Sequence, residues 1–97
     1  MTEVTYVSEV ECVVVVPDGI IESQVVKVMD SENRANTLRV AKGSLVEKGG
    51  KTYLPVGLVR VDRERKCALV ELPQEADSGT RRVWLPFARF RRQENGE

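Results

Sequence analysis

The chain has 97 residues, which suffices for one domain with a single hydrophobic core and leaves little room for a deep pocket. It contains no histidine, so the commonest general base, the Ser-His and Cys-His catalytic pairs and the commonest nitrogen ligand for metals are all missing. The formal net charge is zero, but residues 1–32 hold seven acids and one base, whereas residues 33–97 hold fourteen bases and eight acids.

The first predicted element is a long hairpin over residues 4–29. Apolar and polar residues alternate in its first half, as in a half-buried strand, and every residue of Cys12–Val16 is apolar. The apolar run predicts a strand covered on both faces, by the rest of a barrel or by a second subunit. Pro17-Asp18-Gly19 predicts a turn, and Ile20–Met29 predicts the returning strand.

Cys12 and Cys67 lie far apart inside apolar runs and form no CxxC pattern. We expect them to be buried free thiols of a reducing compartment, with a disulfide between them as the less favoured alternative. The early residues show no signal-peptide pattern, and the run Cys12–Val16 is too short to cross a bilayer. We therefore expect a cytoplasmic protein without a membrane partner.

The middle of the chain predicts short elements. Asp30–Asn36 is a polar turn, too short for a stable helix. Thr37–Val40 and Ser44–Glu47 are candidate short strands, and Lys48-Gly49-Gly50-Lys51 is a hairpin signal, because paired glycines suit the positive φ angles of tight turns.

Residues 53–90 predict a strand meander. Three short β-rich runs are separated by a charged turn at 62–66 and a polar loop at 73–80; the runs are Val56–Val61, Cys67–Leu72 and Arg82–Leu85. Six or seven short strands without a helix predict an all-β fold, a small SH3-like or related partly open β-barrel. We expect a single domain over residues 1–92 and a flexible tail over residues 93–97.

Two segments carry a resemblance to known proteins. Leu54–Val61, the charged turn and Ala68–Leu72 resemble the middle of small SH3-like barrels. Trp84–Phe90 is similar to their ending, where a strand closes with proline and one tight helical turn leads to the final strand. Bacterial PRC-barrel domains show a comparable pattern, and the strings ELPQEADSG and RVWLP suggest an uncharacterised bacterial family. The resemblance covers residues 54–90 and implies docking onto a protein or a ribonucleoprotein; the hairpin over residues 4–29 has no counterpart in it.

The candidate contact residues form two sets. The first is basic and brackets Trp84, Phe87 and Phe90; it comprises Arg81, Arg82, Arg89, Arg91 and Arg92. Arginines can neutralise phosphates while aromatic rings stack on bases, although these rings also suit a core beneath a closing turn. The second is the loop set Glu75, Asp77 and Ser78, whose oxygens suit a partner contact better than a metal because no calcium-loop spacing is present.

Two functions follow from these patterns. The leading one is a non-enzymatic interaction module, without metal or cofactor, that binds a protein partner or associates with itself. The alternative is RNA or single-stranded DNA binding through the arginine-rich C-terminal end. The division of charge along the chain favours acidic and basic strands that pair across a sheet. The alternative interpretation is a charged face that binds nucleic acid or an acidic partner.

Overall fold

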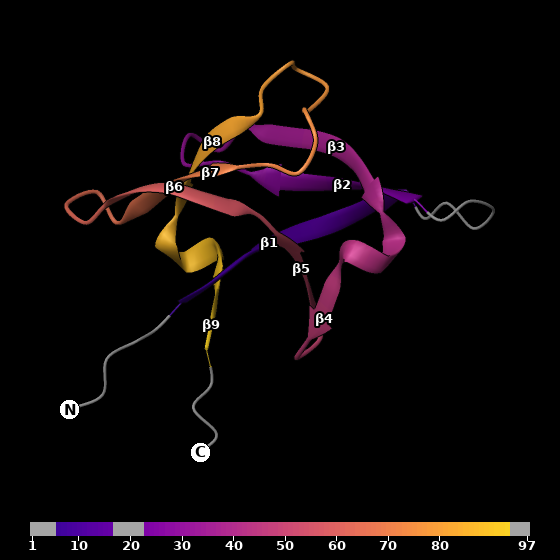
Figure 1. Ribbon diagram of the computed structural model, residues 1–97, viewed down its shortest axis with the longest axis horizontal. Helices are drawn as coiled ribbons and strands as arrows, with labels where there is room; N and C mark the ends of the chain where they lie inside the picture. The colour runs from indigo at the N-terminus through magenta and orange to yellow at the C-terminus, as the bar shows by residue number, and fades with distance from the viewer. Residues whose placement is uncertain (1–5, 17–22, 94–97) are drawn as a thin grey trace.

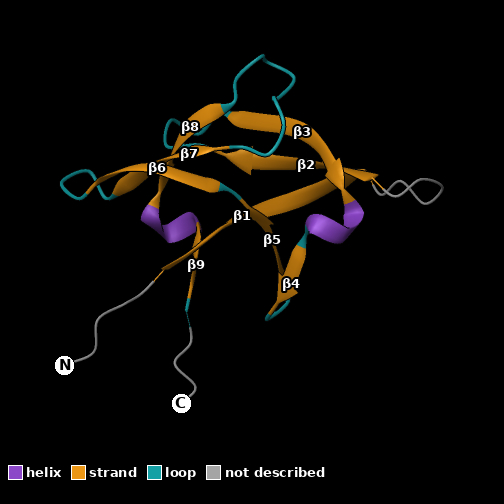
Figure 2. Cartoon of the chain, in the orientation of Figure 1, coloured by secondary structure: helices purple, strands orange, loops and turns teal. Residues whose placement is uncertain are grey.

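The computed structural model describes residues 6–16 and 23–93, and every statement below refers to these residues. They form nine strands and two 3₁₀ turns (Figures 1 and 2). The elements are β1 Tyr6–Val16, β2 Ser23–Met29, β3 Ala35–Ala41, η1 Lys42–Ser44, β4 Val46–Lys48, β5 Lys51–Pro55, β6 Gly57–Asp62, β7 Cys67–Glu71, β8 Arg82–Pro86, η2 Phe87–Arg89 and β9 Phe90–Arg92. The predicted all-β class is confirmed.

The strand count differs from the predicted six or seven. β4 and β9 have three residues each, which is too short to show a period-two pattern in a sequence. β4 and β5 are separate strands on either side of Gly49 and Gly50, whose φ angles are +60° and +81°. Lys48 pairs with Lys51 across this turn, so the predicted glycine hairpin is confirmed.

The strands form two antiparallel sheets. The first has the order β3-β2-β1-β5-β4, with β9 also paired to β1, and the second has the order β6-β7-β8. Both sheets are open, and no pairing among the described residues closes them into one barrel. The chain passes between the sheets at Val56, which separates β5 from β6, and returns through η2 after β8. The Val56 amide donates to the Ser8 carbonyl over 3.0 Å and fixes the first passage against β1.

The predicted N-terminal hairpin is present as the antiparallel pair β1–β2, in which Val14 faces Val26. The predicted turn Pro17-Asp18-Gly19 lies outside the described residues. The expected cover on both faces is found on one face only, because Val13 and Val15 remain 58% and 46% exposed. The other described residues therefore leave Val13 and Val15 on the outer face of β1 uncovered.

Residues from both sheets form one hydrophobic core. Val10 and Leu54 of the first sheet and Val70 and Leu85 of the second are fully buried at 0% exposure. Each such side chain contributes about 1.5–3 kcal/mol relative to an exposed one. This shared burial is what holds the two open sheets against each other.

Both cysteines are free and buried, as the sequence predicts. Burial and the neighbouring charge of Glu11 raise the pKa of the Cys12 thiol to about 11. Cys67 begins β7 and lies beside the groove described below.

Candidate interaction surfaces

Arg81 and Arg82 lie together at the start of β8 and share one carboxylate. The Nη2 atom of Arg82 lies 3.1 Å from Oε1 of Glu71, and Nε of Arg81 lies 3.7 Å from Oε2. Arg81 also donates from Nε to the Leu72 carbonyl over 3.1 Å. These two arginines therefore support the β7–β8 connection as well as facing solvent.

The other three predicted arginines lie on the first sheet and the turn leading to it. Arg91 donates from Nε to Oε1 of Glu9 over 2.6 Å, and both side chains are less than one-fifth exposed. Arg92 is exposed at the end of β9, and Arg89 is half-buried in η2. Together with Lys51, which lies 3.4 Å from Glu11, this pairing follows the expected neutralisation of acidic β1 by basic neighbours. The five arginines are divided between two sheets.

The loop set Glu75, Asp77 and Ser78 is held on β3. The Asp77 amide donates to the Thr37 carbonyl over 2.8 Å, and Ala76 is buried at 4% exposure. The Glu75 and Asp77 side chains are exposed. In residues 6–16 and 23–93, no three side chains of the His, Cys, Asp or Glu types gather in a way that could hold a metal ion.

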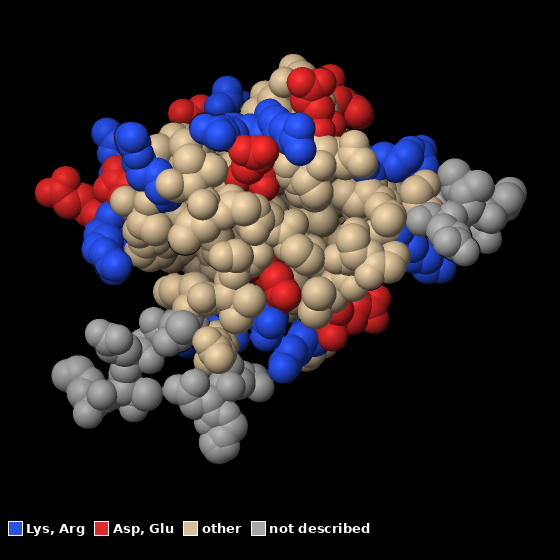
Figure 3. Space-filling model, in the orientation of Figure 1, with Lys and Arg blue, Asp and Glu red and all other residues tan. Residues whose placement is uncertain are grey.

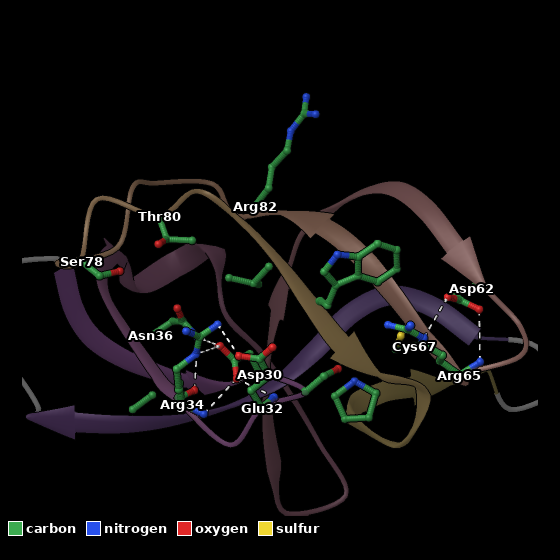
Figure 4. Close-up of a pocket in the computed structure, with 15 residues that line it drawn as sticks. Asp30, Glu32, Arg34, Asn36, Asp62, Arg65, Cys67, Ser78, Thr80 and Arg82 are labelled. Carbon is green, nitrogen blue, oxygen red and sulfur yellow. Dashed lines mark hydrogen bonds and ion pairs between the residues drawn. The ribbon is translucent and has the colours of Figure 1, made fainter.

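A groove of about 700 Å³ runs along β8 (Figure 4). The half-buried Trp84 lines it, and guanidinium groups come to it from three separate segments, namely Arg34 after β2, Arg65 in the β6–β7 turn and Arg82 on β8. Figure 4 shows Arg34 and Arg65 at opposite ends of the groove, whereas the Arg82 side chain points away from the other lining side chains. The Ser31 amide donates to the Trp84 carbonyl over 2.8 Å, which fixes the Asp30–Asn36 turn against β8.

Asp30 organises one wall of this groove. Its Oδ1 accepts hydrogen bonds from the amides of Glu32 and Arg34, each over 2.9 Å, and its Oδ2 accepts one from the Asn36 side chain over 3.2 Å. Burial alone would raise the pKa of this carboxyl group. The hydrogen bonds and the Arg34 charge outweigh that effect and lower the pKa below its ordinary value. The carboxylate is therefore a structural anion that fixes the turn and positions Arg34.

β6 presents a different kind of surface. It is an edge strand that, among the described residues, pairs only with β7, and it exposes Leu58, Val59 and Val61 at 53%, 40% and 41%. The register pairs Leu58 with buried Val70 and Val61 with buried Ala68. Directly opposed residues in an antiparallel pair share a face, so Leu58 and Val61 lie on the core side without being covered. Figure 3 shows a mainly uncharged area across the face in view, with most charges at its margins.

The other sheet edges are occupied or charged. The Thr37 carbonyl on β3 accepts a hydrogen bond from the β7–β8 loop, and the Trp84 carbonyl on β8 accepts one from Ser31. β4 and β9 are only three residues long and end in charged residues, Lys48 and Arg92. Short length, charge and cover are the usual protections of an edge. Among the described edge strands, β6 alone exposes three large apolar side chains.

Sequence reasoning missed both surfaces in part. Arg34 and Arg65 lie in turns that were predicted as polar connections, and only the fold brings them to Trp84. The run Val56–Val61 predicts a strand of the meander but not its exposure, because a strand that is apolar on both faces has the same sequence pattern whether it is buried or not. A further aromatic prediction is partly confirmed, since Phe90 belongs to the core and Phe87 packs against it, whereas Trp84 lies in the groove.

Comparison of the chain with protein-family models, with curated proteins and with solved structures finds no match. Within the described residues there is no helix of the length and apolarity that a membrane crossing requires.

Proposed function

We propose that this protein is a non-enzymatic interaction module that associates with a second copy of itself through the edge strand β6. The observation that carries the proposal is the half exposure of Leu58, Val59 and Val61 on a strand with one unpaired edge. Apolar edge strands of this kind add a further strand through main-chain hydrogen bonds, and their side chains then complete a covered face.

A β-bulge makes β6 self-complementary. The register shifts between Leu58 and Arg60, so these two residues fall on opposite faces even though they are two apart, and Leu58 shares the core face with Val61. In a two-fold antiparallel pair of β6 strands, Leu58 can face Val61 of the second copy, and Val61 then faces the second Leu58. Four apolar side chains cover one another, and no charged residue faces its own copy.

The outer face of β1 offers a competing surface, since Val13 and Val15 are also exposed. β1 is an interior strand, paired with β2 and β5, so its main-chain groups are already used. A copy could approach it only face to face, over a surface that includes Lys27 opposite Val13. We therefore place the interface on β6, where both main chain and side chains are available.

We also propose that the two sheets form a partly open SH3-like barrel. The two places where the chain passes between sheets, Val56 and η2, support a partly open SH3-like barrel. A crystal structure in which the β6–β7–β8 sheet lies apart from the first sheet, without these bent passages, would reject this architecture.

Sedimentation equilibrium over a wide range of protein concentration tests the self-association. We expect the mass to rise from one copy to two, with a dissociation constant on the order of 10–100 µM, as small interfaces give. Leu58→Glu places a charge in the apolar cluster and should keep the protein monomeric. Val13→Glu makes the same change at an equally exposed valine and should leave the association intact. A wild-type protein that is monomeric throughout, or a loss of association caused by Val13→Glu alone, contradicts the proposal.

A further inference from the structure

The groove along β8 has features that self-association does not use. Trp84 lies on the outer face of the second sheet, since it faces Leu69 in the register, whereas β6 self-pairing covers the inner face. The ring contacts of the described aromatic residues join Tyr6 to Phe87 and to Phe90 and do not involve Trp84. The half-buried indole therefore lines the groove without a ring partner among the described aromatic residues.

The guanidinium groups around this indole face solvent more than the carboxylates do. The side chains of Arg34, Arg65 and Arg82 are 71%, 83% and 59% exposed. Of the three carboxylates in the lining, Asp30 is only 6% exposed and Asp62 34%. Both also accept backbone hydrogen bonds, Asp62 from the Arg65 amide over 3.1 Å.

Glu32 is the one lining carboxylate that is mostly exposed, at 72%. It lies 2.9 Å from Arg34, at the end of the groove away from Arg65. The formal charges of the lining cancel, and Arg82 is paired with Glu71 outside the lining. Arg65 is 83% exposed and lies 3.9 Å from the less exposed Asp62, so its positive charge is presented to solvent. A ligand with a planar ring and an anionic group matches this arrangement.

We propose that the groove binds a nucleotide unit, with the base stacked on Trp84 and the phosphate held by Arg65. Base stacking on an aromatic side chain and phosphate neutralisation by arginine are the two ordinary contributions to single-stranded binding. The groove volume of about 700 Å³ lies within the range of small-molecule sites. The ligand is either a free nucleotide or a nucleotide within a single strand. Arg65 is not one of the C-terminal arginines that the sequence suggested.

Fluorescence provides a direct test, because Trp84 is the only tryptophan in the chain. The full-length protein, at a concentration where it is monomeric, is titrated at low salt with an eight-residue oligo(dT), an eight-residue oligo(U), UMP and a poly-glutamate peptide. We expect quenching by at least one nucleotide probe. Quenching by UMP identifies a free-nucleotide site, and quenching by the oligomers alone identifies a strand site. No quenching by any nucleotide probe, or quenching by poly-glutamate alone, overturns the proposal.

Variants of two arginines in the same turn distinguish binding in the groove from non-specific electrostatic attraction. Arg65→Ala should weaken binding about tenfold, the loss expected of one phosphate contact, whereas Arg63→Ala in the same turn should not, because Arg63 does not line the groove. Equal losses in the two variants would show that binding depends on non-specific electrostatic attraction and would overturn the proposal.

Three further variants test the other parts of the site. Glu32→Gln removes a negative charge from the lining and should strengthen binding. Trp84→Phe, followed by anisotropy of a labelled oligomer, should weaken it. Leu58→Glu should bind as the wild type does, so the failure of one proposal leaves the other intact.

Discussion

Arg91 and Glu9 form a hydrogen-bonded ion pair of 2.6 Å between β9 and β1, although the two residues are 82 positions apart in the sequence. The pair joins the last described strand to the first. Both side chains are largely removed from solvent, at 18% and 17% exposure. Pairs of this kind have a defined geometry and are screened less than fully exposed ones.

The Arg91–Glu9 pair should be measurable in a double-mutant cycle. We expect Arg91→Ala and Glu9→Gln to be coupled by about 1 kcal/mol in the free energy of unfolding, more than for most surface pairs. Urea denaturation of the wild type, both single variants and the double variant gives this value. Strict additivity of the two substitutions would show that the contact contributes nothing to stability.

Asp30 should stabilise the protein in a pH-dependent way. Asp30→Asn removes the charge that the turn amides and Arg34 stabilise, and we expect a loss of about 1–3 kcal/mol at neutral pH. Because the pKa of Asp30 is lowered in the folded protein, its contribution is complete above the ordinary aspartate pKa of about 3.9 and is lost as the pH falls below it. The difference between wild type and variant should therefore shrink in urea denaturation at pH 3. A difference that stays constant or grows there contradicts this interpretation.

The β4–β5 turn should require glycine at Gly50. Its φ of +81° is unfavourable for residues with a side chain, so Gly50→Ala should lower the free energy of unfolding by about 1 kcal/mol. Gly43→Ala is the matched control, since Gly43 has open space around it and no positive φ. Thermal denaturation of both variants compares them. Equal losses of stability in the two variants would mean that the positive φ angle does not require glycine at position 50.

The Cys12 thiol should be inert in the folded protein. With a pKa of about 11, only about one thiolate in a thousand is present at pH 8, and burial limits access further. In a Cys67→Ser variant, we expect Ellman's reagent to react with Cys12 only as fast as the protein unfolds. Complete reaction within seconds under native conditions would contradict the burial of this side chain.

The sequence predicts local elements well where turn chemistry and alternation agree. Gly49 and Gly50 require a tight turn in any fold, and the alternation leading to Cys12 gives the correct inward face of β1. The polar runs before β3 and β7 are correctly predicted as connections. Each of these features depends on a few neighbouring residues, which is why a single sequence reveals it.

The surfaces depend on contacts between distant segments, which the sequence does not encode locally. Arg34 and Arg65 reach Trp84 only because the Asp30 turn docks on β8 and the β6–β7 turn lies at the other end of the groove. Val61 is apolar, as a core residue would be, yet it is 41% exposed on the edge strand β6. Pattern alone cannot distinguish an apolar strand at an open edge from one at the centre of a sheet.

Amide hydrogen exchange measured at low and at high protein concentration tests most directly whether β6 is the interface. If β6 pairs with its copy, the outward-facing amides of Gly57–Asp62 should exchange slowly at high concentration and faster on dilution. The backbone amides at the edges of β3 and β4 and those of β1 should exchange at the same rate at both concentrations. Exchange of β6 that does not change with concentration, or protection that develops at another edge instead, would contradict the account.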